Sequence, residues 1–165
     1  FLVDEARRFA VLRAANSEGG RRMLARRHRL GVGSEGIVGY VTETGKPRVA
    51  LVVGADAVYF DNPDLPETRS EAALPLYVGD EVIGALDVQS TQAAAFDQEA
   101  VTLLMSLADQ IAISIENARL FEENKAALAQ AEEAGRRFLR EEWDNFLSGQ
   151  SVSKSSRPIP SGGTR

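Results

Sequence analysis

Residues that could support covalent or redox catalysis are scarce in this chain. It has no cysteine, which excludes disulfides, thiolate metal sites, thiol nucleophiles and thioether-linked chromophores. Its single histidine, His28, excludes a metal site built from several histidines and would have to serve alone in a Ser-His-Asp hydrolase. Arg27 and Arg29 flank His28 and disfavour its protonated form, but no carboxylate that would orient the ring can be identified. We therefore interpret His28 as a structural or surface residue rather than a haem ligand or general base. We expect a protein that is not an enzyme and that holds no metal or other cofactor.

A glycine-rich segment matches the G-x-G-x-x-G pattern of dinucleotide-binding sites. It reads Gly31-Val32-Gly33-Ser34-Glu35-Gly36, and Asp56 follows twenty residues after Gly36. That pattern requires a buried, apolar, parallel strand directly before it, whereas residues 23–30 contain arginines and a histidine. We therefore interpret the glycines as a tight turn that enters a helix, with Ser34 as a candidate N-cap. A nucleotide-dependent oxidoreductase is the least favoured function.

The composition is that of a globular domain with unevenly distributed charge. The 165 residues are 44% hydrophobic and 26% charged, enough for one domain with additional segments. Residues 1–48 hold ten Lys or Arg against five Asp or Glu, a charge of +5, and the remaining residues hold nine against nineteen, a charge of −10. The basic residues gather between Arg21 and Arg29, and we expect them on an exposed surface that does not bind nucleic acid. No apolar run approaches the roughly 20 residues of a membrane helix, and no signal pattern is present, so we expect a cytoplasmic protein without membrane contact.

Short apolar runs and turn residues predict a sheet of antiparallel strands. The strongest signal is a tight hairpin, residues 70–78 and 81–90 around Gly79-Asp80. Residues 37–44 predict a helix that ends at Gly45, because glycine accepts a left-handed cap and Pro47 cannot continue the helix. The other expected elements are strands at 1–3, 9–15 and 48–53, an irregular strand at 21–30 and a long loop at 56–69. Because the chain enters a strand at Phe1, we expect it to be an excerpt of a longer polypeptide.

A long amphipathic helix is expected to follow Asp97, whose side chain can cap the first turn. A helix from residue 97 to 134 spans roughly 57 Å, more than the roughly 35 Å diameter of the domain before it. Apolar residues recur along it, mostly three or four apart, at Leu104, Leu107, Ile111, Ile115, Ala118, Phe121 and Leu128. Such a stripe favours pairing with a second helix, although residues 101–115 could instead pack on their own sheet. We expect a break at Gly135, a second amphipathic segment at 136–147 and a flexible tail at 148–165.

Several short motifs occur together in an order and spacing that is specific for one fold. They are Gly33-Ser34-Glu35-Gly36-Ile37-Val38-Gly39-Tyr40-Val41 with Thr44-Gly45-Lys46-Pro47; Thr68-Arg69-Ser70-Glu71 before Leu74-Pro75-Leu76; Val82-Ile83-Gly84-Ala85-Leu86-Asp87-Val88; and Phe96-Asp97 followed by Leu107-Ala108-Asp109-Gln110-Ile111-Ala112 and Glu116-Asn117-Ala118-Arg119-Leu120. Residues 1–121 thereby resemble the GAF domain of bacterial multidomain signalling proteins such as sensor histidine kinases and related regulators.

The resemblance implies an α+β fold, GAF-like and related to PAS domains. Its expected features are a central antiparallel sheet of five or six strands, flanking helices and a long C-terminal signalling helix. It also implies a cavity over one sheet face, with terminal helices on the other face that commonly pair in dimers. The signature of the family's cyclic-nucleotide-binding members is absent from the pocket-forming region. Bilin attachment and the family's methionine sulfoxide reductase activity both use cysteine, which this chain lacks.

These observations favour a non-catalytic sensory and dimerisation module that relays the state of a small-molecule cavity through its C-terminal helix. Candidate ligand residues combine aromatic and polar groups: Tyr40, Tyr59, Phe60, Thr68, Arg69 and Ser70. The expected organisation is a sensory domain at 1–121, a helical coiled-coil connector at 122–147 and a linker or disordered tail at 148–165. The expected partners are a second copy, through the terminal helices, and the neighbouring domains of the parent protein. The alternative is a ligand-free spacer that clamps a dimer between signalling domains.

Overall fold

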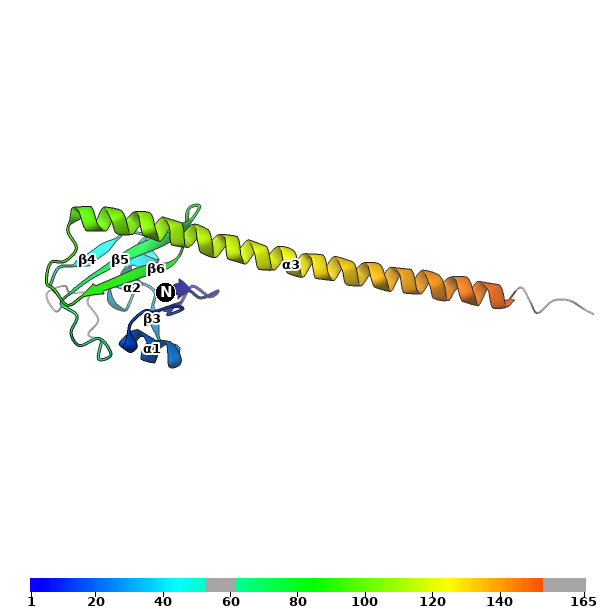
Figure 1. Cartoon of the computed structure of the whole chain (residues 1–165), viewed down its shortest axis with the longest axis horizontal. Helices are drawn as coiled ribbons and strands as arrows, with labels where there is room; N and C mark the ends of the chain where they lie inside the picture. The colour runs from blue at the N-terminus through cyan, green and yellow to red at the C-terminus, as the bar shows by residue number, and fades with distance from the viewer. Residues whose placement is uncertain (53–61, 153–165) are drawn as a thin grey trace, which may run out of the picture. The chain divides into compact units, whose positions relative to one another are not determined.

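The computed structural model describes residues 1–52 and 62–152 of the chain. The chain divides into two units, Phe1–Asn117 and Ala118–Arg165. The first unit contains a six-stranded antiparallel sheet with the strand order β3-β2-β1-β6-β5-β4 (Figure 1). The strands are β1 (Leu2–Val3), β2 (Phe9–Val11), β3 (Arg29–Gly31), β4 (Arg48–Ala50), β5 (Ser70–Val78) and β6 (Glu81–Ser90). The expected α+β fold is therefore confirmed.

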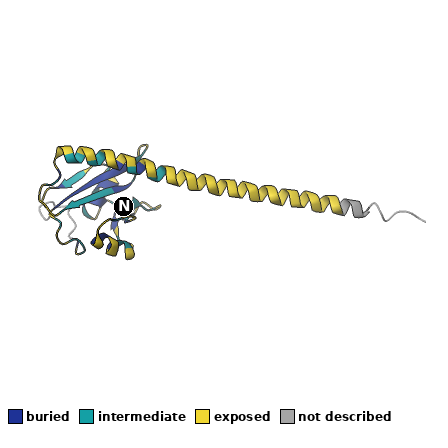
Figure 2. Cartoon of the chain, viewed as in Figure 1, coloured by how far each residue is buried: buried dark blue, intermediate teal, exposed yellow. Residues whose placement is uncertain are grey.

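Two helices cover opposite faces of this sheet. Helix α2 (Gly36–Thr44) packs its buried Ile37, Val38 and Val41 against a cluster that includes Ala73 of β5. Helix α3 (Gln98–Val152) packs its first turns on the other face, where Leu74 of β5 belongs to the same cluster as residues of α3. Successive residues of a strand point to opposite faces, so β5 supplies both clusters, and Figure 2 shows its buried residues between the helices.

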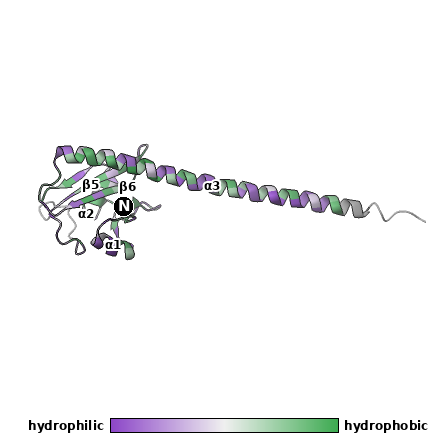
Figure 3. Ribbon diagram, in the orientation of Figure 1, coloured by the Kyte–Doolittle hydropathy of each residue, from purple (hydrophilic) through white to green (hydrophobic). Residues whose placement is uncertain are grey.

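The β5–β6 hairpin confirms the strongest local prediction from the sequence. The two strands pair from Ser70 with Ser90 to Val78 with Glu81, around Gly79 and Asp80. Gly79 has a φ of +59°, a left-handed conformation that glycine adopts without steric cost. The hairpin is the longest paired segment of the sheet, and its hydrophobic residues are visible in Figure 3.

Helix α2 ends as the sequence predicts, although its first turn does not begin as predicted. Gly45 is the C-cap with a φ of +68°, and its N–H donates to the carbonyl of Val41. Ser34 is not the N-cap, which was wrong: Glu35 holds that position and makes no capping hydrogen bond to the helix. The Glu35 carboxylate instead accepts a 2.6 Å hydrogen bond from the N–H of Gly31, which tightens the glycine turn. The strand before this turn, β3, is an antiparallel edge strand rather than the parallel strand that a dinucleotide site requires.

The predicted irregular strand at 21–30 is wrong over most of its length. Residues Glu18–Ala25 form helix α1, which Ser17 caps by accepting a hydrogen bond from the N–H of Gly20. Only Arg29–Gly31 of the segment is a strand. The helix has one buried apolar side chain, Met23, which is too little periodicity for a sequence pattern to reveal.

Two of the other expected strands are shorter in the structure. Strand β2 ends at Val11 rather than residue 15, and β4 ends at Ala50. Leu51 and Val52, which the sequence placed in that strand, are exposed. Residues 56–61 of the expected loop at 56–69 lie outside the described residues, and residues 62–69 form neither helix nor strand.

Helix α3 begins as predicted and continues past the predicted break. The carboxylate of Asp97 accepts a 2.8 Å hydrogen bond from the N–H of Ala100, so Asp97 caps the first turn. Gly135 does not interrupt the helix, so the expected break is wrong. A glycine inside a helix costs only about 1 kcal/mol, and the alanine, glutamate and arginine residues around it favour helix. The expected tail at 148–165 is helical to Val152, and its remainder lies outside the described residues.

No helix in the described ranges, 1–52 and 62–152, is long and apolar enough to span a membrane.

Candidate ligand cavity

A cavity of about 800 Å³ lies in the first unit, bounded by the sheet and by helix α1. Its walls come from β1, β6, α1, two residues of α3 and the segments 12–17 and 64–68. Apolar side chains form much of the lining, namely Phe1, Leu2, Leu12, Met23, Leu65, Leu86, Ile111 and Ile115. Pockets that hold small molecules commonly have roughly 300–1,000 Å³ and a mostly apolar lining with a few polar groups. This cavity has the size and character of such a pocket.

The polar groups of the cavity converge on Gln89. Asp87 and Gln89 are two residues apart on β6 and share a sheet face with Ala85, while Glu71 pairs with Gln89 across the ladder. The Gln89 amide nitrogen donates to Asp87 (3.0 Å) and to Glu71 (3.3 Å), and its amide oxygen accepts a 2.6 Å hydrogen bond from the Thr68 hydroxyl. These four residues, Thr68, Glu71, Asp87 and Gln89, are here called the acid–amide cluster; Thr68, Asp87 and Gln89 line the cavity beside its apolar side chains.

Burial raises the pKa of the Asp87 carboxyl above its usual value, and hydrogen bonding with Glu71 and Gln89 opposes part of that rise. The α-ammonium of Phe1, which donates a 3.0 Å hydrogen bond to the carbonyl of Ala85, also lowers the pKa of Asp87 through its positive charge. The cluster therefore attracts positive charge. A positively charged group in the cavity would meet the acceptors of this cluster.

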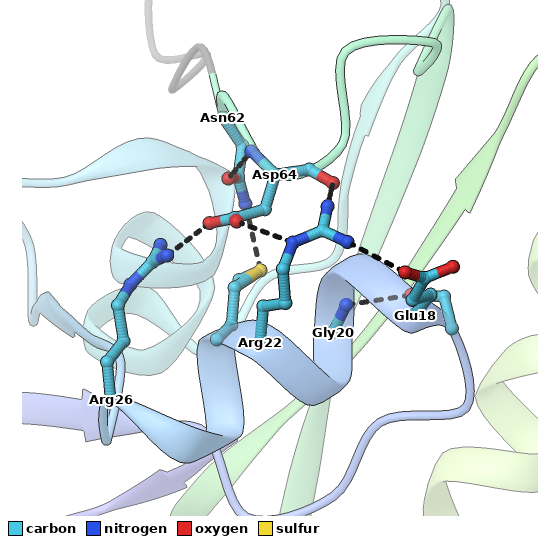
Figure 4. Close-up of polar contacts among 8 residues, drawn as sticks. Glu18, Gly20, Arg22, Arg26, Asn62 and Asp64 are labelled. Carbon is cyan, nitrogen blue, oxygen red and sulfur yellow. Dashed lines mark hydrogen bonds and ion pairs between the residues drawn. The ribbon is translucent and has the colours of Figure 1, made fainter.

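Asp64 joins the two covering segments of the cavity, α1 and residues 62–68, as Figure 4 shows. Its carboxylate accepts from Arg26 and, at 3.3 Å, from Nε of Arg22, and the Arg22 guanidinium also donates to the Asp64 carbonyl at 3.2 Å. Asn62, itself buried, donates from its amide to the sulfur of Met23 at 3.3 Å. Although burial opposes ionisation, hydrogen bonds from Arg26 and Arg22 hold the pKa of the Asp64 carboxyl below its usual value. These charge-assisted hydrogen bonds hold α1 and residues 62–68, the two segments that cover the cavity, together.

His28 lies outside the cavity lining, and its protonated form is disfavoured as predicted, although by burial and Arg26 rather than by Arg27 and Arg29. Burial and the charge of Arg26 lower the pKa of its imidazole, and the carboxylates of Asp64 and Glu35 oppose this effect. Its ring contacts Phe1 edge to face, with centroids 6.3 Å apart. Its backbone carbonyl accepts from Leu12 in the β2–β3 ladder, which fits a structural position.

The structure places the predicted ligand residues at different sites. Thr68 lines the cavity, and Arg69 follows it with its backbone N–H bonded to Ser90. Ser70 is fully buried, and its hydroxyl donates to the carbonyl of Gln92 at 2.7 Å. Tyr40 packs on the α2 side of the core, with the Arg48 guanidinium 4.9 Å from its ring centre. Tyr59 and Phe60 lie outside the described residues, so their role in a site stays a prediction.

Sequence reasoning missed the acid–amide cluster. The available signal was Asp87 directly after the apolar run Val82-Ile83-Gly84-Ala85-Leu86, together with Gln89 two positions later on the same strand face. A carboxylate at such a position is costly unless it is paired or functional. No group of three or more histidine, aspartate or glutamate residues within the described ranges could hold a metal ion.

The predicted helix seam divides into two sets in the structure. Leu104, Ile111 and Ile115 are half-buried and pack on the sheet of their own unit. Leu107 is 45% exposed, and in the second unit Ala118, Phe121 and Leu128 are exposed. Pairing with another helix therefore stays a prediction for the exposed set.

Comparison with known proteins identifies the family. The GAF domain profile matches residues 1–116, so the chain belongs to the GAF domain family. No curated protein sequence matches the chain.

Among solved structures, free methionine-R-sulfoxide reductase from Neisseria meningitidis in complex with its substrate is 29% identical, with a TM-score of 0.51 over 56% of this chain and 54% of the other. The GAF domain of phosphoenolpyruvate-protein phosphotransferase from Coxiella burnetii is 25% identical, with a TM-score of 0.52 over 58% of this chain and 60% of the other. The corresponding Acinetobacter domain is 22% identical, with a TM-score of 0.59 and coverage of 74% and 71%, and it shows the fold alone. This chain spans about half the length of the Neisseria reductase.

Proposed function

We propose that this GAF domain is a non-catalytic sensory module that binds a small, positively charged molecule in its cavity. The acid–amide cluster carries the proposal: Asp87 and Gln89 line the cavity beside apolar side chains, Thr68 fixes the orientation of Gln89, and Glu71 accepts a hydrogen bond from Gln89. A ligand with an ammonium or similar cation and an apolar body matches both parts of this cavity.

The likeness to the Neisseria free methionine-R-sulfoxide reductase supports a small-molecule role, because the structure of that protein is a complex with its substrate. The absence of cysteine from this sequence supports a binding role without thiol chemistry. Both considerations favour a domain that recognises a metabolite without converting it.

A homodimer that pairs the α3 helices is the proposed route of signal output. Exposed apolar residues on α3, Leu107 in the first unit and Phe121 and Leu128 in the second, support the pairing. Ile111 and Ile115 line the cavity and belong to the same helix, so a ligand that displaces them changes the base of the paired helices. A ligand shifts such an equilibrium only through different affinities for the two helix arrangements. We infer that the parent protein is a sensor kinase or related regulator, in which neighbouring domains receive this change.

The test is a thermal-shift and calorimetric panel of primary amines, from methylamine to phenethylamine, each paired with the alcohol of the same shape. We expect stabilisation by one or more amines and none by the matched alcohols. Asp87→Asn should abolish the response, whereas Asp80→Asn, in the exposed β5–β6 turn, should preserve it. If no amine stabilises the protein and the protein is nevertheless a dimer, the result would favour the ligand-free spacer.

A further inference from the structure

The β2–β3 end of the sheet carries arginines around an apolar centre on the face that α3 packs against. In the ladder, Val11 pairs with Leu2 on one side and with Arg29 on the other, and Leu2 belongs to the α3 cluster. The next hydrogen bond, from Leu12 to the carbonyl of His28, sets Arg13 opposite Arg27 at the end of the ribbon. The surface formed by Arg8, Phe9, Val11, Arg13, Arg27 and Arg29 is called the arginine surface below.

The arginine surface has the chemistry of a protein interface. Phe9 and Val11 are half-buried, and the Arg29 and Arg8 guanidinium carbons lie 4.1 Å and 5.8 Å from the Phe9 ring centre. All four arginines are exposed, and within the described ranges none of them forms an ion pair. Arginine and aromatic residues around a desolvated centre are typical of protein–protein contacts, so a partner with apolar and acidic groups fits this surface.

Helix α3 of the same chain presents such a combination. Its sheet-facing side, which includes Ala108, Ile111 and Ala112, is opposite a side on which Leu103 and Ile113 are 67% and 60% exposed. Asp109 and Glu116 are seven residues apart, two helical turns, and therefore share a flank next to Ile113. The opposite flank contains Leu107, the exposed residue of the proposed seam in this unit.

A two-fold axis parallel to paired helices brings these two surfaces together. If two copies meet through the Leu107 flank, their α3 helices lie side by side. The two-fold rotation then points the side of each α3 that faces away from its own sheet toward the sheet of the partner subunit. Ile111 and Ile115, which lie toward this flank, line the cavity together with Leu2 and Arg13, so the flank is the one nearest β1 and the arginine surface. The outer side of the second helix then faces the half of the sheet that includes the arginine surface.

We propose that, in the homodimer inferred above, α3 of each protomer lies on the arginine surface of its partner. Ile113 packs against Phe9 and Val11 of the partner subunit, and Asp109 and Glu116 pair with Arg13 and Arg29 of the partner subunit. The inference rests on the proposed dimer and deepens it by naming the contact in trans. Because Arg13 also lines the cavity, the partner's helix becomes part of the surroundings of the ligand, which couples dimerisation to cavity occupancy.

Charge reversal with mixed chains tests the contact in trans. In a homodimer of the Arg13→Glu, Arg29→Glu chain, the acidic residues of α3 face the two introduced glutamates and repel them. In a homodimer of the Asp109→Arg, Glu116→Arg chain, the two introduced arginines of α3 face the arginine surface and repel it. By sedimentation velocity, each doubly substituted chain should dimerise about tenfold or more weakly than the parent chain. An equimolar mixture of the two should form heterodimers with near-parental affinity, because both contacts in the mixed pair are complementary.

The controls are Arg21→Glu, on α1, and Glu99→Arg, in the first turn of α3, which should leave dimerisation within about twofold of the parent. Melting temperatures measure folding, and the neutral variants Arg13→Gln with Arg29→Gln give a second test if reversal unfolds the domain. Parental dimerisation of both doubly substituted chains, or no preference for the mixed dimer, overturns the arginine-surface contact while the α3 dimer stands. A parent chain that is monomeric at all concentrations contradicts the proposed dimer itself.

Discussion

Alanine at Gly45 should destabilise the domain more than alanine at Gly79, and the structure gives the difference. Both glycines are left-handed, with φ of +68° and +59°, so a Cβ costs about 1–2 kcal/mol at either position. At Gly79 the added carbon meets nothing within 4 Å, so this backbone cost is the whole effect. At Gly45 it overlaps the Tyr77 hydroxyl, which donates a 3.0 Å hydrogen bond to the Gly45 carbonyl. Losing that bond adds about 1 kcal/mol, giving a total of about 2–3 kcal/mol.

Urea unfolding followed by circular dichroism measures both variants, and a third variant isolates the cause. In Tyr77→Phe the hydroxyl is absent, but the added carbon still lies 3.0 Å from the aromatic ring and 3.3 Å from Val82, so the cost of Gly45→Ala should fall toward that of Gly79→Ala without reaching it. Equal destabilisation by the two alanines in the parent background would refute the close approach of the α2 cap to β5. An effect at Gly45 that persists unchanged in Tyr77→Phe would refute the assignment to the hydroxyl.

The remaining predictions concern the core, the cavity and the dimer. Leu74→Ala, at a fully buried position, should lower the free energy of unfolding by about 2–5 kcal/mol in a urea titration. Asp64→Asn should lower the melting temperature at neutral pH and speed hydrogen exchange in α1; since the pKa of Asp64 is lowered in the fold, this difference should vanish as the pH falls through the acid range. The pKa of Asp87 is raised in the fold, so the folded state binds the Asp87 proton more tightly than the unfolded state does. The melting temperature should therefore decline as the pH rises above the usual range of a carboxyl pKa, and Asp87→Asn should reduce that decline. Phe121→Ala with Leu128→Ala should weaken dimerisation by about tenfold or more in sedimentation experiments, because each side chain is more than 60% exposed in the single chain.

The elements with local physical signals were predictable from the sequence. The Gly79-Asp80 hairpin and the Gly45 cap depend on glycine at a left-handed position, and both are in the structure as predicted. The cap of α3 was predictable because the carboxylate of a residue directly before a helix, here Asp97, can accept a hydrogen bond from a free N–H group of the first turn. Gly135 was misread because one glycine cannot end a helix whose neighbours favour it.

Helix α1 and the cavity depend on contacts between distant residues, which periodicity does not encode. Arg22 of α1 and Arg26 at its C-cap pair with Asp64, about forty residues away, and the spacing of the two arginines does not predict that partner. Glu71 and Asp87 meet across two strands, and each looks like an isolated acid in its own segment. Thr68 was predicted as one of the polar groups that suit a small-molecule pocket, and its hydrogen bond to Gln89 places it in the acid–amide cluster.

The central claim, a cavity that receives a cation at Asp87, is tested most directly by amide chemical-shift mapping with phenethylamine and its alcohol counterpart. The account predicts saturable shifts for the amine at Thr68, Asp87, Gln89 and the α1 residues that line the cavity, and none there for the alcohol. Shifts that are absent, or that are equal for amine and alcohol, or that survive Asp87→Asn, would contradict it.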